Sequence, residues 1–177
     1  MCPGGRIPVG SRSRIRLRLL AALALCTLAV AMAGCGDGPD PSPEAMAAEL
    51  EAALTELVRG PSPEERTRGV TSFFSSETSH IVRSVSVEGG LARVDFRDFR
   101  PLIPCASSSA GSEAFLDDLN RTVFGAVPVT EVEYTLEGDC EPFWNFLQYG
   151  CQRVHRGNDE GRVRYSPHPD SGGEPEV

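Results

Sequence analysis

The 177-residue chain contains no lysine, so all 17 of its basic residues are arginines. A phosphate-binding Walker A loop, a Ser-x-x-Lys nucleophile pair and a Schiff-base site each need a lysine amine. The sequence therefore excludes all three. It also lacks a Gly-x-Ser-x-Gly segment, which excludes the sharp turn that carries the serine nucleophile of α/β-hydrolases.

Histidine is scarce as well. The three histidines are His80, His155 and His168, and none has a second histidine or a glutamate at metal-binding spacing. We interpret them as surface or tail residues. A zinc site built on Cys140, Cys151 and His155 would lack a fourth ligand. We therefore predict no metal and no cofactor.

Residues 1–34 are typical of a secretory signal peptide. The first 18 residues contain five arginines and no acidic residue, and residues 19–33 are almost all apolar. This apolar run is shorter than the roughly 20 residues that a membrane span needs, and it ends at small residues. We therefore predict that residues 1–34 form a cleaved signal peptide.

The end of this signal, Met32-Ala33-Gly34-Cys35, resembles a bacterial lipobox, with Met32 in the position usually held by leucine. In such signals the cysteine is linked to diacylglycerol and becomes the new N-terminus. Residues 35–43 are rich in Gly, Asp and Pro, which is typical of a flexible linker. We expect Cys35 to carry lipid and to hold the protein at the outer face of the cell membrane. The alternative is a secreted protein with a free Cys35.

Cleavage after residue 34 would leave 143 of the 177 residues, enough for one domain with a modest core. The remaining chain would have 12 arginines against 25 acidic residues, a net charge of −13. Nucleic-acid binding needs a basic surface, so we expect no nucleic acid among the partners.

Three other cysteines would remain, namely Cys105, Cys140 and Cys151. Thiols outside the membrane tend to oxidise, so one disulfide and one odd cysteine is the simplest count, and three pairings are possible. We favour Cys140 with Cys151, because a bridge there would close a compact segment. On the chain-entropy model such a bridge contributes about 3 kcal/mol.

Two patterns predict the first elements of the fold. Ser42-Pro43 is a helix-start signal, and apolar residues then recur at helical spacing up to Gly60. In residues 80–88 and again in residues 92–96, apolar and polar residues alternate, and Gly89-Gly90 lies between the two stretches. We predict a helix followed by a β-hairpin.

The rest of the chain predicts a small α+β domain. We expect a loop over residues 97–111, a second helix that opens at Ser112 and ends before Gly125, and a third strand after Pro128. A short helical turn and a further strand follow. This order predicts a small mixed or antiparallel sheet with two helices packed on it. Residues 157–177 are rich in Gly, Pro, Asp and Ser, so we expect a disordered acidic tail.

Several segments occur in a suggestive order: Leu57-Val58-Arg59-Gly60-Pro61, a hairpin that ends in Val94-Asp95-Phe96, Ser109-Ala110-Gly111-Ser112, and Phe143-Trp144. Their order and spacing resemble the GerMN domain, the sporulation and spore-germination module, over residues 44–156. The resemblance implies a small extracytoplasmic domain that often occurs in lipoproteins. That family has no agreed catalytic residues, so none is carried over. The pair Cys140 and Cys151 resembles a variant in which both flank an aromatic segment, and Cys105 would then be the odd thiol.

The aromatic segment is a possible ligand platform. Phe143, Trp144 and Phe146 lie within four residues of one another, and a bridge would brace them. They would either stack on a sugar or peptide or fill the core of a small domain.

These patterns predict a non-catalytic binding or interaction module, anchored to the membrane and in contact with envelope protein or peptidoglycan. The runner-up is an envelope hydrolase that uses Asp95 or Asp98 as an acid. A small-solute-binding lipoprotein is a further alternative.

Overall fold

The computed structural model describes residues 41–157 and 162–169. The chain divides into two compact units, and every described residue belongs to the second, Pro41–Val177. The expected signal peptide and Cys35 lie outside the described residues, as do residues 36–40 of the expected linker. Within the described part of the chain, no helix has the length and apolar character to cross a membrane.

The unit consists of a five-stranded sheet with helices packed on it, which confirms the predicted α+β class. The strand order is β1-β2-β3-β4-β5; β2 and β3 are parallel, and the other neighbours are antiparallel. The elements are α1 (Pro43–Arg59), α2 (Pro63–Thr67), η2 (Ser76–Thr78), β1 (Val82–Glu88), β2 (Leu91–Phe96), η3 (Pro104–Ser107), α3 (Ser109–Ala126), β3 (Glu131–Leu136), α4 (Cys140–Phe146), β4 (Gln152–Arg156) and β5 (Val163–Pro167).

The first helix and the hairpin form where the sequence predicts them. The Ser42 hydroxyl accepts a hydrogen bond from the Ala45 amide, which caps α1. Gly60 ends the helix with a φ of 71°, a conformation that glycine adopts without strain. Gly89 and Gly90 both have positive φ in the turn between β1 and β2, as a tight hairpin turn requires.

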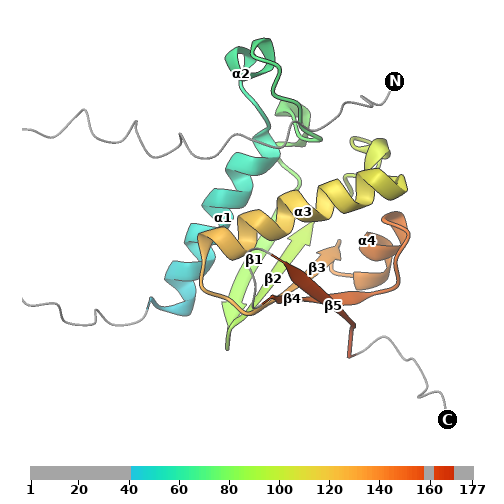
Figure 1. Cartoon of the computed structure of the whole chain (residues 1–177). Helices are drawn as coiled ribbons and strands as arrows, with labels where there is room; N and C mark the ends of the chain where they lie inside the picture. The colour runs from blue at the N-terminus through green and yellow to red at the C-terminus, as the bar shows by residue number, and fades with distance from the viewer. Residues whose placement is uncertain (1–40, 158–161, 170–177) are drawn as a thin grey trace, which may run out of the picture. The chain divides into compact units, whose positions relative to one another are not determined.

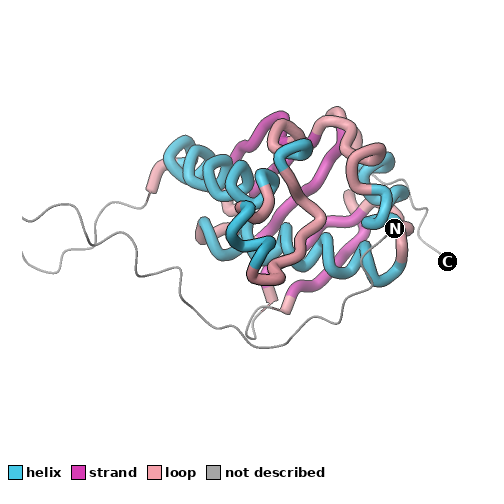
Figure 2. Tube along the Cα trace, turned by 90° about the horizontal axis from the view of Figure 1, so that it is seen from above, coloured by secondary structure: helices cyan, strands magenta, loops and turns pink. Residues whose placement is uncertain are grey.

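Helices α1 and α3 contact each other and lie on one face of the sheet (Figure 1). Seen from above, both lie over the strands (Figure 2). Between helices and strands is a core of fully or almost fully buried apolar side chains, of which the largest are Trp144, Tyr134, Phe96, Phe99, Phe115 and Phe143. The opposite face of the sheet carries charged residues, because side chains alternate along each strand.

The second helix begins earlier and ends later than predicted. Helix α3 spans Ser109–Ala126, so Gly125 lies inside it. Its cap is Ser108, whose hydroxyl accepts from the Gly111 amide. The Ser112 hydroxyl instead donates to the Ala106 carbonyl and is buried. A run of serines offers several equivalent caps, and tertiary packing selects among them.

The prediction of disorder after residue 157 is wrong for β5. This strand pairs with β4 in register from Gln152 and Pro167 to Arg156 and Val163. A strand this short has little local signal, and its position depends on contacts with distant residues. Residues 158–161 and 170–177 lie outside the described residues.

Candidate functional site

The structure places the predicted aromatic platform mostly in the core. Phe143 and Trp144 have no exposed surface, and Phe146 is half-buried against Phe99, with ring centroids 5.8 Å apart. A flat ligand has no access to the faces of the two buried rings. Of the two interpretations of this segment, the platform is therefore wrong for Phe143 and Trp144, and the core interpretation holds.

Cys140 and Cys151 form the favoured disulfide, with their Cα atoms 5.7 Å apart. The bridge joins the first residue of α4 to the residue that precedes β4. A nitrogen of His168 and the two sulfurs lie within 4.8 Å of one another. Because both sulfurs are bonded to each other, neither offers the thiolate that a metal ion needs.

Asp95, one of the two acids considered for a hydrolase, joins three elements of the sheet. One carboxylate oxygen accepts from the Thr135 hydroxyl at 2.7 Å and from the Gly138 amide at 2.8 Å. The other accepts from Arg83 at 2.7 Å. Burial raises the pKa of Asp95, but the bonds from Thr135, Gly138 and Arg83 outweigh it, so this pKa is lowered.

Asp98, the second acid, pairs with its neighbour on the chain. Both of its carboxylate oxygens accept from the Arg100 guanidinium, at 2.8 Å each, and this contact lowers the pKa of Asp98. A general acid at neutral pH needs a raised pKa, so that it holds its proton until the reaction. Asp95 and Asp98 have the opposite shift, which suits structural anchors.

The polar face of the sheet is held together by a nearly buried carboxylate, that of Glu133. Its two oxygens accept from Arg93 at 3.1 Å, from Arg153 and from His168 at 3.1 Å. Burial raises the pKa of Glu133, but the hydrogen bond and charge of Arg153 and the charges of His168 and Arg93 lower this pKa by more. The net shift is downward, so this carboxylate is ionised and fastens neighbouring strands together.

Of the three histidines predicted to lie at the surface or in the tail, His80 is exposed, whereas His155 and His168 are half-buried. His155 lies 2.7 Å from the Ser166 hydroxyl, and His168 contacts Glu133. Both therefore help to hold β4 and β5 on the polar face.

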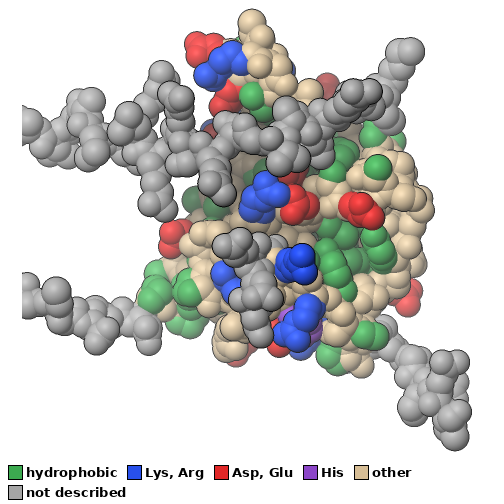
Figure 3. All heavy atoms as spheres, in the orientation of Figure 1, with side chains coloured by type: hydrophobic (Ala, Val, Ile, Leu, Met, Phe, Trp, Pro, Cys, Tyr) green, Lys and Arg blue, Asp and Glu red, His purple; other side chains and the backbone are tan. Residues whose placement is uncertain are grey.

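A groove with a volume of about 960 Å³ lies between α3 and β5. Hydrophobic side chains gather beneath α3 towards α4, with charged side chains around them (Figure 3). Tyr149 and Tyr165 are 40% and 46% exposed and stand in this groove. Both rings meet Trp144 edge-on, at 6.3 Å and 6.1 Å between centroids. Two half-exposed tyrosines thus cover a buried tryptophan, which is a contact surface suited to a flat or apolar group.

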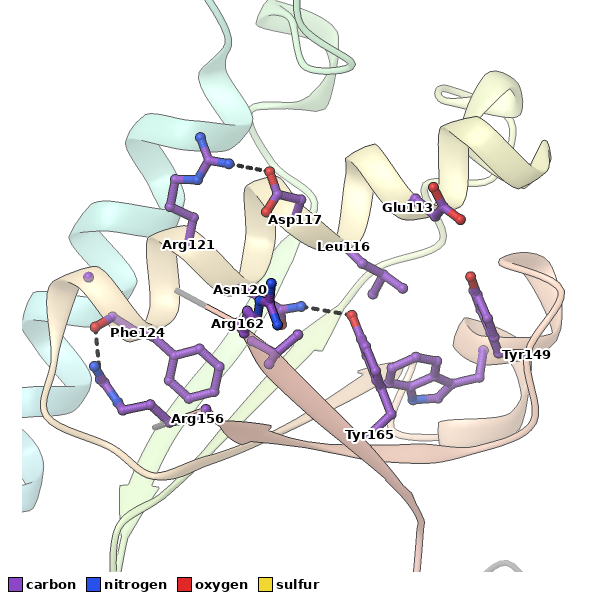
Figure 4. Close-up of a pocket in the computed structure, with 14 residues that line it drawn as sticks. Glu113, Leu116, Asp117, Asn120, Arg121, Phe124, Tyr149, Arg156, Arg162 and Tyr165 are labelled. Carbon is purple, nitrogen blue, oxygen red and sulfur yellow. Dashed lines mark hydrogen bonds and ion pairs between the residues drawn. The ribbon is translucent and has the colours of Figure 1, made fainter. Parts of the chain in front are cut away.

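A chain of hydrogen bonds runs from the core to this groove. The buried Tyr134 hydroxyl donates to the side-chain carbonyl oxygen of Asn120 at 2.9 Å. The Asn120 amide nitrogen in turn donates to the Tyr165 hydroxyl at 3.2 Å (Figure 4). Burial raises the pKa of Tyr134 and of Tyr165, so both phenols keep their protons at neutral pH. The Tyr165 hydroxyl, already an acceptor from Asn120, retains its own proton for a ligand.

The two ends of the groove differ in charge. Glu113 and Tyr149 lie at one end, and Phe124 and Arg156 lie at the other, with Arg162 between them in this view (Figure 4). Arg156 donates to the Phe124 carbonyl at 2.8 Å and stacks over the Phe124 ring at 4.9 Å, so it closes the end of α3. Glu113 and Arg162 are exposed, and the carboxylate of the one and the guanidinium of the other form no hydrogen bond or ion pair with another described residue.

Sequence reasoning missed this groove because its two walls are far apart in the chain. One wall is the face of α3 around Leu116 and Asn120, and the other includes Val163 and Tyr165 of the strand that the sequence did not predict. The Val163-Arg164-Tyr165-Ser166 alternation was the available signal, but four residues are too few to identify a strand among Gly and Pro.

Comparison with known families gives one assignment. Residues 38–140, more than half of the chain, match the family model Germane, described as sporulation and spore germination. No curated protein and no solved structure matches the chain. The match contains α3 and ends at the first residue of α4, whereas β4 and β5 follow it. Val163 and Tyr165 of the second wall of the groove therefore lie outside the matched residues. This chain belongs to the Germane family of sporulation and spore germination domains.

Proposed function

We propose that the chain is a lipid-anchored binding module of the cell envelope, held at the outer face of the membrane by lipid on Cys35, with no catalytic step of its own. The observation that carries the binding role is the groove between α3 and β5, where Tyr149 and Tyr165 are half-exposed. The charged groups of Glu113 and Arg162 also line it and have no partner among the described residues. The lipobox-like Met32–Cys35 supports the anchor.

The absence of a catalytic role is supported by the acids themselves. Asp95 and Asp98 have lowered pKa values and are bonded to arginines, so neither suits proton donation at neutral pH. The groove contains no histidine or cysteine among its described lining residues. Its chemistry therefore suits contact and hydrogen bonding rather than nucleophilic attack.

A small-solute-binding lipoprotein is the alternative that the volume of the groove favours, because about 960 Å³ lies within the range of small-molecule pockets. A thermal-shift screen against metabolites separates the two. A compound that raises the melting temperature by several degrees, and loses this effect in Tyr165→Ala, would support the solute alternative and count against a macromolecular partner.

Intact mass spectrometry of protein extracted from membranes tests the anchor. We expect a chain that begins at Cys35 and carries acyl mass, and a Cys35→Ser variant that loses the acyl mass and leaves the membrane fraction. Recovery of the full chain with Met1 from the soluble fraction would contradict the anchor.

Site-specific photo-crosslinking in the producing cells tests the binding role. A benzophenone amino acid replaces Tyr149 in the groove or, as the matched control, the exposed Ser84 on β1. We expect an envelope component to crosslink from position 149 and not from position 84. Equal yields from both positions, or none from either, would contradict a binding role for the groove.

A further inference from the structure

In the described part of the chain, strand β5 forms one edge of the sheet and pairs with β4 alone. Two backbone hydrogen bonds fix which residues of β5 turn their backbone N–H and C=O towards β4. The Gly157 amide donates to the Arg162 carbonyl at 2.7 Å, and the His168 amide donates to the Cys151 carbonyl at 3.1 Å. In an antiparallel pair, hydrogen-bonded and non-hydrogen-bonded residues alternate. Between these two bonds, the backbone N–H and C=O of Arg164 and Ser166 therefore point towards β4.

The intervening residues of β5 face away from β4. Val163 and Tyr165 each turn a backbone N–H and C=O outward, and Pro167 turns out a C=O alone. Among the described residues, nothing pairs with these groups. A free edge of this kind is a template for another strand, and Pro167 limits its length at one end.

The free edge and the groove lie at the same place. Side chains alternate along a strand, and the two residues with outward backbone, Val163 and Tyr165, are the ones whose side chains line the groove beneath α3. A strand added to β5 would send every second side chain into the groove. There the side chains would meet Leu116 and Phe124 of α3, together with Tyr149.

The positive charge of Arg164 on β5 favours an acidic residue on the added strand, between the two residues whose side chains enter the groove. The side chain of Arg164 is exposed and points to the opposite face of the sheet from Tyr165. Its guanidinium forms no hydrogen bond or ion pair with another described residue. Arg162 lines the groove and is also exposed, and its guanidinium forms no hydrogen bond or ion pair with another described residue. An acidic side chain on the added strand would lie across from Arg164, where opposite charges attract.

We infer that the groove binds an extended segment of another protein, which adds to β5 as a sixth strand. The segment places two apolar side chains, two residues apart, beneath α3, and an acidic side chain between them faces Arg164. Unpaired backbone groups in strand register recognise a polypeptide backbone, whereas a sugar offers no matching repeat. The inference rests on the proposed binding role of the groove and names the class of its partner.

The test is selection of a displayed library of random 12-residue peptides against the full chain. We expect enriched peptides with the apolar-acidic-apolar pattern. Synthetic copies are then N-methylated at one amide at a time, and their affinities are measured by fluorescence anisotropy. Methylation should weaken binding at least tenfold at every second amide and less than twofold at the amides between. No enrichment, or sensitivity without this period of two, would overturn the inference.

A pair of variants locates the binding on the chain. Val163→Pro removes an outward N–H at the first residue of β5 and no hydrogen bond to β4, so it should weaken peptide binding at least tenfold. Val163→Thr keeps this N–H and the shape of the side chain, so its affinity should stay within twofold. Equal affinity of both variants would overturn the inference. If Val163→Pro does not fold, the methylation series decides alone.

Failure of this inference is distinguishable from failure of the proposed function. If position 149 crosslinks to material that lysozyme releases as glycan, the binding role stands and the added strand is wrong. If selected peptides bind with a period of two while position 149 captures nothing in cells, the added strand stands and the envelope role is wrong. Self-association that Val163→Pro abolishes would assign the edge to a second copy and overturn the inference.

Discussion

Replacement of Asp95 by alanine should destabilise the domain without touching the groove. The carboxylate of Asp95 on β2 accepts from Thr135 on β3, from the amide of Gly138 in the turn after β3, and from Arg83 on β1. Its side chain is 13% exposed, whereas that of Arg83 is 44% exposed. The inner bonds should therefore matter more than the ion pair.

The magnitude follows from these contacts. A hydrogen bond to a charged group contributes about 1.5–3 kcal/mol to the free energy of unfolding, and an exposed ion pair contributes at most about 1 kcal/mol. We expect Asp95→Ala to lose roughly 3 kcal/mol, because the bonds to Thr135 and Gly138 both disappear. Asp95→Asn keeps an acceptor oxygen for both and should lose about 1 kcal/mol. Arg83→Ala, the control for the ion pair, should lose less than about 1 kcal/mol.

The effect should depend on pH with a definite sign. The pKa of Asp95 in the folded state is lowered from its ordinary value of 3.8. A group with a lowered folded pKa stabilises the fold above its unfolded pKa, and this contribution is lost as the pH falls through the folded pKa. The difference in stability between Asp95→Asn and the parent chain should thus be full at pH 7 and shrink below about pH 4.

Urea unfolding followed by the fluorescence of Trp144 measures these differences, because it is the single tryptophan of the chain and is fully buried. Two outcomes would refute the reasoning. One is an Asp95→Ala variant within about 0.5 kcal/mol of the parent chain, which is the ordinary range for surface substitutions. The other is a stability difference for Asp95→Asn that does not change between pH 7 and pH 3.

Two further predictions concern the frame of the domain. Replacement of Cys140 and Cys151 by serine should lower the free energy of unfolding by about 3 kcal/mol, and the same loss in the parent chain after reduction would identify the bridge as its cause. Gly60→Ala should be strongly destabilising, because its Cβ would lie 2.1 Å from the Phe74 carbonyl oxygen. The matched control is Gly69→Ala, which has a similar positive φ and no atom within 4 Å; it should lose only about 1 kcal/mol. Equal losses in the two glycine variants would contradict the steric argument.

The parts of the fold that could be predicted are those with local causes. The Ser42 cap, the Gly60 helix end and the Gly89-Gly90 turn each depend on the conformational preferences of one or two residues. The pairing of Cys140 with Cys151 is also local, because only a short helix and turn separate them.

The parts that could not be predicted depend on partners distant in the chain. Asn120 is a polar residue, a type that is usually exposed. It is nevertheless only 3% exposed, because Tyr134 of β3 and Tyr165 of β5 contact it. In the sequence, Trp144 is a candidate stacking residue, but in the structure Tyr149 and Tyr165 cover its ring. The candidate site was missed for the same reason, since it needs β5 beside α3.

Residue-resolved amide hydrogen exchange over residues 162–168 of the free, dilute chain tests the open edge of β5 most directly. The account predicts slow exchange at Arg164 and Ser166, whose amides face β4, and fast exchange at Val163 and Tyr165, whose amides point away from β4 at the open edge of the sheet. Slow exchange at Val163 and Tyr165, equal to that of their neighbours, would show that the edge is already occupied and would contradict the account.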